Sequence, residues 1–496
     1  MIIVNVKDYG AAGNGITLDT EFIQSAIDAA HSLAMKEMED INAGTSGSIG
    51  TEDDGSCGSI YTEDDGSCGS IYTKDDDSCK EYNIEKIVRE ISSGRSCEPK
   101  IQVIVPCGTY LVGSLFLKSY VELHLEKGSV LLGTTDEASY PMMKTRVAGI
   151  EMEWPVGIVN VNDAVHAAVT GAGTINGQGP YWWNKYWGPD TKGGMRAEYQ
   201  QKGLRWCVDY DCRRVRNLIV MNSRHVNLSG FESVRSGFWN IHLCYSEDIH
   251  VEGLHIYDND GPSTDGIDID SCSHVWVEKC IIACNDDSIC VKSGRDADGL
   301  RVNRICEDVL IENCEIQTGA GVTIGSETSG GVRRIVIRDL SYKNTRYGFR
   351  MKSAANRGGL IEEVFVDNLE MVNVMYPIHM CLNWNPAYSY SELPEDYEGQ
   401  ISSHWNILTE KVDREIGLPK VRNITVKNVN SYNEAGYEGI SRAIEMEAFS
   451  EKPMSNIAFV NVRIKAAEFG RIQGVKDLLF QNVQISAKGE QDNVSE

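Results

Sequence analysis

The feature that most constrains the fold of this chain is a nine-residue pattern that recurs through its second half. Each copy reads polar, apolar, any, apolar, any, polar, apolar, any, apolar, which is the alternation expected of two short strands joined by a bend. The copies lie 21 to 34 residues apart, except for one longer excursion after Glu363. They begin at Asp248, His274, Asp308, Arg334, Glu363, Asn423, Asn456 and Asp477. A two-strand unit at this period predicts an all-β chain that folds as a right-handed parallel β-helix, in which each coil stacks on the one before.

A stack of coils leaves its first coil exposed, and the sequence near residue 20 offers a cover. Apolar residues recur there with helical spacing. The residues on this face are Phe22, Ile23, Ala26, Ile27 and Ala30. We expect the helix to cap the N-terminal end of the β-helix, where unpaired strand edges would otherwise be open. The rest of the chain continues the stack, so residues 1–496 are predicted to form a single domain.

One segment differs in composition from the rest. From Thr51 the sequence TEDDGSCGSIY occurs twice and is followed by a weaker third copy, at a period of 11 residues. Ten acidic residues against two lysines between Thr51 and Glu81 leave little to bury. We therefore predict that residues 44–98 are a disordered acidic insertion. Its Asp and Cys residues lack the spacing of a standard metal site, and no chemical role is expected for it.

Charge and hydropathy narrow the classes of partner. The formal net charge of −25 argues against a nucleic-acid-binding surface, and no run of 18 apolar residues suggests a membrane span. The first residues lack the basic and apolar regions of a leader peptide, so a cytoplasmic protein is expected as the sequence stands. A secreted protein with its leader removed would look the same. The 15 cysteines are odd in number and often occupy apolar positions, which favours free thiols in a reducing compartment.

Acidic residues gather at the second short strand of successive coils. Alignment of the strands GIDID, SICVK, VTIGS and FRMKS puts Asp265, Asp287, Ala320 and Tyr347 in one column, with Asp286 beside it. Since neighbouring strands lie about 4.8 Å apart, three carboxylates crowd one patch. Crowding raises the pKa of at least one carboxyl group and gives a protonated acid beside an ionised base. Inverting glycosidases need such a pair, with carboxyl groups roughly 6.5 to 9.5 Å apart.

Two basic residues follow on the same face. Arg350 and Lys352 lie two coils beyond the acids, and they offer local positive charge for an anionic ligand on an otherwise acidic chain. A single Asp at a β-helix turn is most often structural. Three acids followed in register by R-M-K favour a site.

Four segments resemble the signature segments of glycoside hydrolase family 28, the polygalacturonases and their relatives. They are STDGID from Ser263, NDDSICVKSG from Asn285, GAGVTIGSE from Gly319 and RMK from Arg350. VKDYGAAGNG near the start and GAGTINGQGPYWW from Gly171 agree, so the resemblance covers nearly the whole chain apart from the insertion. It implies a pectin-lyase-like β-helix that cleaves α-linked galacturonosyl bonds of pectic oligosaccharides or polysaccharides, without a metal or other cofactor.

The resemblance also implies catalytic roles. Asp286 would be the general acid that protonates the glycosidic oxygen. Asp265 and Asp287 would hold and activate the attacking water, with inversion at the anomeric carbon.

Four further residues are implied to contact the substrate. Arg350 and Lys352 match the family's cationic motif, which binds the uronate carboxylate at the cleavage site. Tyr347 stands in the column of the acids. Glu327 belongs to GSETSGGV, which resembles the form found in exo-acting members. An exo-enzyme that trims oligogalacturonides is the activity expected from these features.

The third signature segment departs from the family pattern, because Ala320 stands where a histidine is usual. This leaves open a rhamnogalacturonan-specific glycosidase of the same family. A pectate-type lyase with Ca²⁺ and a non-catalytic carbohydrate-binding β-helix are the alternatives from other classes. Two aromatic-rich stretches, from Pro180 and from Asn383, interrupt the repeat. They offer Trp182, Trp187 and Trp384 for stacking on a sugar, unless these rings pack the loops onto the coils.

Overall fold

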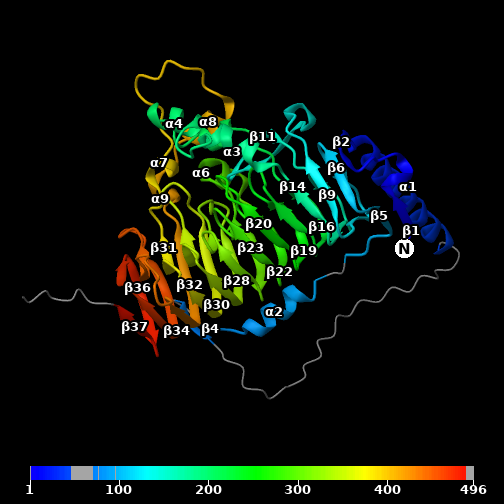
Figure 1. Ribbon diagram of the computed structural model, residues 1–496. Coiled ribbons are helices and arrows are strands. Elements are labelled where there is room, and N and C mark those ends of the chain that lie inside the picture. The colour runs from blue at the N-terminus through cyan, green and yellow to red at the C-terminus, as the bar shows by residue number, and fades with distance from the viewer. Residues whose placement is uncertain (1, 46–70, 76–77, 95–96, 488–496) are drawn as a thin grey trace, which may run out of the picture.

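The computed structural model describes residues 2–45, 71–75, 78–94 and 97–487 of the chain. Within these residues the chain winds through successive coils, and each coil adds short strands to parallel sheets that run the length of the molecule. Figure 1 shows the strands side by side in one long stack, from β1 (Ile2–Asn5) at one end to β37 (Gln484–Ala487) at the other. The predicted right-handed parallel β-helix is confirmed.

One sheet has eleven strands in the described part of the chain, each paired in parallel with the strand of the next coil. Its strands are β7 (Leu115–Leu117), β12 (Val159–Asn162), β15 (Leu218–Met221), β18 (Ile241–Cys244), β21 (Ile267–Asp270), β24 (Ile289–Lys292), β27 (Val322–Ile324), β29 (Tyr347–Lys352), β31 (Tyr376–Cys381), β33 (Arg442–Glu447) and β35 (Glu468–Gln473). Side chains alternate along each strand, so every second residue enters the core and the others lie on the outer face. The outer face of this sheet carries the candidate site.

The remaining strands of the coils form a second, larger parallel sheet, in which most coils contribute two short strands. These strands form two rows, which are called the two faces of this sheet below. One face holds β1, β5 (Ile101–Val105), β8 (Val121–Leu125), β13 (Ala168–Gly171), β16 (Arg224–Ser229), β19 (Glu247–Glu252), β22 (Ser273–Glu278), β25 (Cys306–Glu312) and β36 (Val475–Gln481). The other holds β2 (Asn14–Leu18), β6 (Gly108–Val112), β9 (Ser129–Gly133), β14 (Thr174–Asn176), β17 (Glu232–Val234), β20 (His255–Asn259), β23 (Ile281–Cys284), β26 (Glu315–Thr318) and β37. In the later coils one long strand runs through both faces: β28 (Val332–Lys343), β30 (Leu360–Val372), β32 (Lys420–Tyr432) and β34 (Met454–Ala466).

The nine-residue repeat is the unit of this larger sheet. The second residue of each copy stands in one column, because Ile249 pairs with Val275, Val275 with Val309, and so on as far as Leu478. Leu478 is partly buried, and the other members of the column are fully buried. Each buried aliphatic side chain contributes roughly 1.5 to 3 kcal/mol, so the repeat is a direct record of the core.

The polar residues of the repeat mark bends of the coil. The first and sixth residues have left-handed backbone conformations, as in Asp308 with φ of 56° and Asn313 with φ of 53°. Asn and Asp tolerate this region better than most residues do. Some of these amides also connect coils, as where Asn461 Nδ2 donates to Asn428 Oδ1 at 3.1 Å. This is why Asn and Asp recur at fixed points of the pattern.

Helix α1 (Thr20–Thr45) covers the first coil, as predicted, and Figure 1 shows it at the end of the stack beside β1. Its buried residues are Ile23, Ala26, Ile27, Ala30 and Ala34. Phe22 departs from the prediction, because its side chain is 37% exposed and its ring lies against Gly10 rather than the core. The buried face is therefore narrower than expected and consists mainly of alanine and isoleucine.

Part of the predicted insertion is folded. Helix α2 (Ile84–Ser92) begins after Asn83, whose side chain accepts a hydrogen bond from the backbone N–H of Lys86. Its apolar stripe packs on an apolar patch of the larger sheet. The stripe consists of Ile84, Ile87, Val88 and Ile91, and the patch of Trp276, Leu310, Val336 and Phe365. The expectation of disorder across 44–98 does not hold for this helix, because its apolar residues recur at helical spacing and meet a matching surface.

Two strands of the insertion, β3 (Ile71–Asp75) and β4 (Ser78–Tyr82), form an antiparallel hairpin. The first acidic repeat and the second up to residue 70 lie outside the described residues.

Segments between the coils gather along one side of the stack. They include the antiparallel hairpin of β10 (Met142–Val147) and β11 (Ile150–Pro155). The helices are α3 (Gly179–Trp187), α4 (Gly194–Gln201), α5 (Val208–Asp211), α6 (Asp296–Val302), α7 (Pro386–Ser389), α8 (Ser403–Thr409) and α9 (Arg414–Gly417), with short 3-10 turns η1 (Val6–Tyr9) and η2 (Glu137–Ser139). Figure 1 shows α3, α4, α8 and β11 together at this side. Trp154, Trp206 and Trp405 form a small second core that joins these segments.

No helix among the described residues combines the length and the apolar character needed to cross a bilayer. The twelve cysteines whose side chains the structure describes are free thiols, and most of them are buried, as predicted.

Candidate active site

The parallel pairing of β21, β24, β27 and β29 sets the geometry of the site. Ile267 pairs with Ile289, Ile289 with Val322, and Val322 with Phe349. The residues two positions earlier are therefore at one level of the sheet, and they are Asp265, Asp287, Ala320 and Tyr347. The outward residues of the strands form the next column, which consists of Asp268, Cys290, Thr323 and Arg350. Side chains far apart in sequence are thus neighbours because their coils are neighbours.

Asp265, Asp286 and Asp287 meet at this level. One carboxylate oxygen of each lies within 4.8 Å of the others. Asp265 and Asp287 are buried, whereas Asp286 is partly exposed. The expected separation of roughly 6.5 to 9.5 Å is too large for these nearest oxygens. The physical reason is the coil spacing, because side chains in register on adjacent strands start only about 4.8 Å apart.

Asp287 is surrounded by positive charge. Its Oδ1 accepts hydrogen bonds from Arg350 Nη1 at 3.1 Å and from the Thr323 hydroxyl at 2.7 Å. Its Oδ2 accepts one from Lys352 Nζ at 2.6 Å. Burial raises the pKa of Asp287, but Lys352, Arg350 and Lys292 outweigh burial and hold the pKa below its ordinary value. Asp287 is therefore an ionised carboxylate throughout the neutral range.

The pKa values of the two neighbouring acids move the other way. Burial and the charge of Asp287 raise the pKa of Asp286, against the opposing effect of Lys352 and Arg350. Burial also raises the pKa of Asp265 well above its ordinary value, and Asp268 and Asp286 add to this. The trio thus combines one carboxyl group whose pKa is lowered with two whose pKa values are raised. Asp265 resembles Asp286 in this respect rather than its predicted partner Asp287.

Lys292 is a site residue that the sequence analysis did not single out. Its Nζ donates to Glu327 Oε2 at 3.1 Å and lies 3.5 Å from Asp268 and 3.9 Å from Asp265. The alternation of SICVK could have found it, because Lys292 lies on the same outward face as Cys290.

Glu327 lines the pocket of the acids, as expected of a residue that contacts the substrate. Its Oε2 is held by Lys292 and its Oε1 by the Ser326 hydroxyl at 2.6 Å. Burial raises the pKa of Glu327, but Lys292, Arg357 and Lys352 overcome this and lower it to about 2. Glu327 is therefore an anion whose charge is already paired within the protein.

Aromatic rings cover the two predicted cations. The guanidinium of Arg350 lies 3.8 Å from the centroid of the Tyr347 ring, and Lys352 Nζ lies 4.5 Å from that of Trp384. Trp384 lines the pocket. Tyr347 therefore acts on the site through Arg350, and Trp384 lies beside Lys352.

The other predicted tryptophans do not line the pocket. Trp182 is buried in the main core with its Nε1–H donating to Gly177, and Trp187 packs in a small cluster against α4. Trp239, which was not singled out, lines the pocket and lies 5.0 Å from Lys292 Nζ. Aromatic content alone did not distinguish rings that face the pocket from rings that face the core.

Ala320 lies beside Asp287 in the same column, on the next coil. Its backbone N–H donates to the carbonyl of Asp286 at 2.8 Å, and its side chain is fully buried. The Thr323 hydroxyl on the next strand supports Asp287. A neighbouring hydroxyl thus provides one of the contacts that hold the carboxylate in place.

The acids line an open pocket of about 540 Å³. The turn of the β10–β11 hairpin forms part of its wall, with Ala148 in the lining and Gly149 against Glu327. A Cβ atom added to Gly149, which has φ of +90°, would lie 2.6 Å from Glu327 Cγ and from Arg295 Cβ. The hairpin turn is therefore seated directly on Glu327. Arg205, Asp209 and Tyr388 complete the wall.

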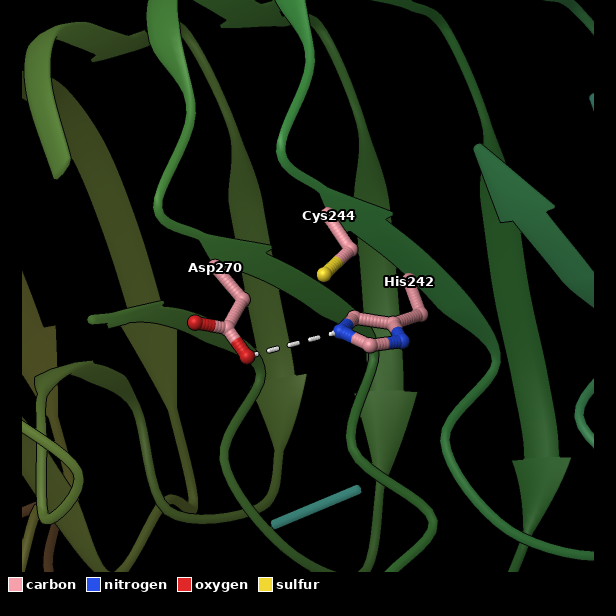
Figure 2. Close-up of side chains that lie close together, drawn as sticks. All are labelled: His242, Cys244 and Asp270. Atoms are coloured by element: carbon pink, nitrogen blue, oxygen red, sulfur yellow. Dashed lines mark ion pairs between the residues drawn. The ribbon is translucent and has the colours of Figure 1, made fainter. Parts of the chain in front are cut away.

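A buried polar cluster lies beneath Trp239. Figure 2 shows His242 and Cys244 on one strand and Asp270 on the next, with their side chains pointing toward one another. Their donor atoms lie within 4.8 Å of one another, and His242 Nε2 is 3.7 Å from Asp270 Oδ2. This arrangement has the side-chain types of a metal site.

Its electrostatic surroundings do not suit a cation. Arg216 Nη1 lies 2.6 Å from His242 Nδ1, and Arg146 Nη1 donates to Asp270 at 2.8 Å. Burial lowers the pKa of His242 to about 4 and raises that of Cys244 well above its ordinary value. A neutral imidazole and thiol between two guanidinium groups form a structural network.

Comparison with known proteins agrees with this geometry. The model of the family described as glycosyl hydrolases family 28 matches residues 100–390. A probable polygalacturonase from Vitis vinifera is 28% identical over 393 residues, which cover 77% of this chain and 70% of the relative. An exopolygalacturonase from Zea mays is 24% identical over 401 residues, or 79% and 80% of the two chains. The solved structure of a hyperthermoactive exopolygalacturonase from Thermotoga maritima has a TM-score of 0.66 at 24% identity, covers 97% of this chain and 93% of its own, and shares the fold.

Proposed function

Because the chain belongs to glycosyl hydrolases family 28, it is a glycoside hydrolase, and we propose that it removes galacturonosyl units from the ends of pectic oligogalacturonides. The observation that carries the proposal is the contrast between Asp286 and Asp287. The pKa of Asp286 is raised and that of Asp287 is lowered, although the two residues are adjacent in sequence. General acid–base cleavage of a glycosidic bond needs this division.

The proposed reaction assigns one proton transfer to each of these two groups. Protonated Asp286 donates its proton to the glycosidic oxygen as the C–O bond breaks. Ionised Asp287 accepts a proton from the water that attacks the anomeric carbon. Asp265 holds the same water as a hydrogen-bond partner, and its raised pKa suits it to orientation rather than to proton abstraction.

Inversion at the anomeric carbon is part of the proposal. Asp265 and Asp287 belong to adjacent coils, so their carboxyl groups can hold one water between them. The nearest oxygens of the trio are closer than the separation usual in inverting enzymes, which makes the stereochemistry a necessary measurement. Proton NMR of the first product to appear distinguishes the β-anomer, expected for inversion of an α-linkage, from the α-anomer.

Arg350 and Lys352 provide the charge for recognition of a uronate. Both contact Asp287, so two cations share one carboxylate and leave one positive charge in excess. A substrate carboxylate beside them completes the balance while Asp287 stays ionised. This supports pectic oligosaccharides as substrates and accounts for anion binding by an acidic protein.

Exo-action is supported by the segments between coils that wall the pocket beside the acids. The hairpin turn at Gly149 lies against Glu327, and Tyr388 and Arg205 continue the wall. A chain that enters such a pocket is bound at its terminus, whereas an open groove accepts an interior segment.

The test measures reducing-end release and identifies products with oligogalacturonides and, separately, rhamnogalacturonan oligomers. Wild type is expected to release monomeric galacturonate from the first substrate only. Asp286→Asn is expected to lower the rate of this release by about 10²- to 10⁴-fold. Release of mixed oligomers would contradict exo-action. Turnover of rhamnogalacturonan alone would show that rhamnogalacturonan, rather than oligogalacturonide, is the substrate. An unsaturated product that absorbs in the near ultraviolet would indicate a lyase.

A further inference from the structure

Arg205 introduces a positive charge into the wall of the pocket. It lies between α4 and α5, lines the same pocket as the three acids, and its side chain is 25% exposed. One guanidinium nitrogen, Nη1, donates to Asp209 Oδ2 at 2.9 Å. The Tyr388 ring, 5.5 Å from the guanidinium carbon, helps to fix the plane of the group.

The charges around Arg205 do not balance. Asp209 also accepts a hydrogen bond from Arg214 Nη2 at 3.1 Å, so one carboxylate is shared by two guanidinium groups. Arg214 is fully buried between the rings of Tyr186 and Phe238, and its Nη1 donates to the carbonyl of Pro262. The group of three carries one net positive charge, and its members Arg205 and Asp209 both line the pocket. An anionic ligand would be drawn to this point.

The position of Arg205 along the stack is defined by Ser263. The Ser263 hydroxyl donates to Asp209 at 3.4 Å, and Ser263 lies just before Asp265 in the coil of β21. Arg350 and Lys352 lie on β29, beyond the coil of Asp286 and Asp287. Along the stack Arg205 therefore lies near the coil of Asp265, Lys292 lies among the carboxyl groups, and Arg350 and Lys352 lie beyond them.

This order matches two consecutive uronosyl units. Each unit carries one carboxylate, and the bond between the units must lie at the carboxyl groups of the protein. We infer that Arg205 binds the carboxylate of the terminal uronosyl unit, while Arg350 and Lys352 bind that of the following unit. The inference rests on the proposed function and specifies it further, because it makes a charged terminal sugar a requirement beside Arg205. The planar guanidinium supplies the paired N–H groups that suit a carboxylate.

The test compares two disaccharides that differ only in the terminal unit that Arg205 is inferred to bind. One is digalacturonate, and in the other the terminal carboxylate is replaced by the neutral CH₂OH of galactose. Arg205→Gln is expected to lower kcat/KM on digalacturonate by about 10- to 100-fold, mainly through KM, and to change the neutral substrate by less than about 3-fold. Arg205→Lys keeps the charge and is expected to retain more of the preference than Arg205→Gln.

Arg196→Gln is the matched control, since Arg196 is an exposed arginine on α4 in the same segment. It is expected to leave both substrates unaffected. An equal loss on both disaccharides would overturn the inference, because that pattern indicates a structural role for Arg205.

Failure of the proposed function gives a different result, namely that wild type cleaves neither disaccharide. The inference is then tested by calorimetric binding of both disaccharides in the Asp286→Asn background. Tighter binding of digalacturonate that disappears on adding Arg205→Gln supports the role of Arg205, and unchanged discrimination refutes it.

Discussion

Lys352 donates a hydrogen bond of 2.6 Å from its Nζ to Oδ2 of Asp287, and both side chains are almost fully buried. The contact joins a residue expected to bind substrate to a residue expected to activate water. It lowers the pKa of Asp287, and to a smaller extent it opposes the rise in the pKa of Asp286. One ammonium group therefore acts on both halves of the proposed acid–base pair.

The first prediction concerns the pH dependence of kcat/KM. The proposed reaction needs ionised Asp287 and protonated Asp286. Because the pKa of Asp287 is lowered, activity is expected to persist into acidic solution. An ordinary aspartate has a pKa of about 4. Because the pKa of Asp286 is raised above this, activity is expected to survive above pH 4 and to fall as the pH rises through the raised pKa of Asp286.

Lys352→Met tests the cause of this profile. Loss of the ammonium removes a charge that lowers the pKa of both carboxyl groups, so both limbs of the profile are expected to move to higher pH. The maximal kcat/KM is expected to fall too, but the pH values at which the two limbs of the profile lie do not depend on the size of that maximum. Lys411→Met, at an exposed position beside Glu392, serves as the control. Limbs that stay in place in Lys352→Met would show that Lys352 does not set these pKa values.

A second prediction concerns stability at Asp268. Burial raises its pKa, Lys292 opposes this, and Asp287, Asp270 and Glu327 add to it. A raised pKa in the folded state means that the group's contribution to stability is fully present below its unfolded pKa and is lost as the pH rises from there through the folded pKa. Asp268→Asn is expected to raise the unfolding temperature by about 1 to 3 °C at pH 7 and to change it little at pH 4.

Asp209→Asn provides the contrast for this experiment. Arg205 and Arg214 overcome burial and lower the pKa of Asp209, so its contribution to stability is present above the unfolded pKa. Removal of this charge leaves two guanidinium groups without a counterion and is expected to cost about 3 to 5 kcal/mol of unfolding free energy at pH 7. Calorimetric melts of both variants at the two pH values check the opposite signs.

A third prediction concerns the close approach of the hairpin to Glu327. Gly149→Ala would place a Cβ atom 2.6 Å from Glu327 Cγ in a backbone conformation with φ of +90°. The variant is expected to push the turn away from the pocket and to lower kcat/KM for galacturonate release by about 10-fold or more. Product analysis shows whether longer products appear as the wall retreats.

Gly436→Ala separates the two sources of strain in that variant. Gly436 has φ of +89°, nearly equal to that of Gly149, but an added Cβ meets nothing within 4 Å. It therefore carries the conformational cost of about 1 kcal/mol without the collision. If both variants lost activity equally, contact with Glu327 would not explain the effect.

The last prediction concerns helix α2. Ile87→Asp puts a charge into the interface between α2 and the patch that includes Leu310 and Phe365. The helix is expected to detach locally, so cleavage between α2 and β5 by a protease is expected to rise about 10-fold or more. Activity on oligogalacturonides is expected to stay within about 2-fold, because α2 packs on the larger sheet. Glu90→Ala, at an exposed position of the same helix, is the control.

The repeat predicted the fold well because it reports burial directly. Val275, Val309 and Ile335 occupy one column of the core, and any chain that buries them in register must stack its coils. The meeting of Asp265 and Asp287 follows from the same register. Their separation did not follow, because the expected gap came from a general rule for glycosidases rather than from the coil spacing.

The walls of the site could not be predicted in this way. Arg205 belongs to a segment between coils, where no periodicity indicates which side chain faces the pocket, whereas Trp239 stands two residues before Ile241 and so falls in the column of Asp265. Trp182 illustrates the difficulty, because it stands in an aromatic stretch beside Trp183 and yet is buried in the core. Helix α2 was missed because the acidic composition of its surroundings concealed four apolar residues at helical spacing.

The floor and the end wall of the pocket come from separate stretches of chain. The acids and the cations of β24 and β29 are built into the stacked coils, whereas the wall is a hairpin and short helices added between coils. Lengthening or losing a hairpin leaves the register of the stack unchanged. Evolution can therefore convert terminal trimming into cutting within a polymer, or the reverse, by exchanging a loop while the chemistry is inherited intact.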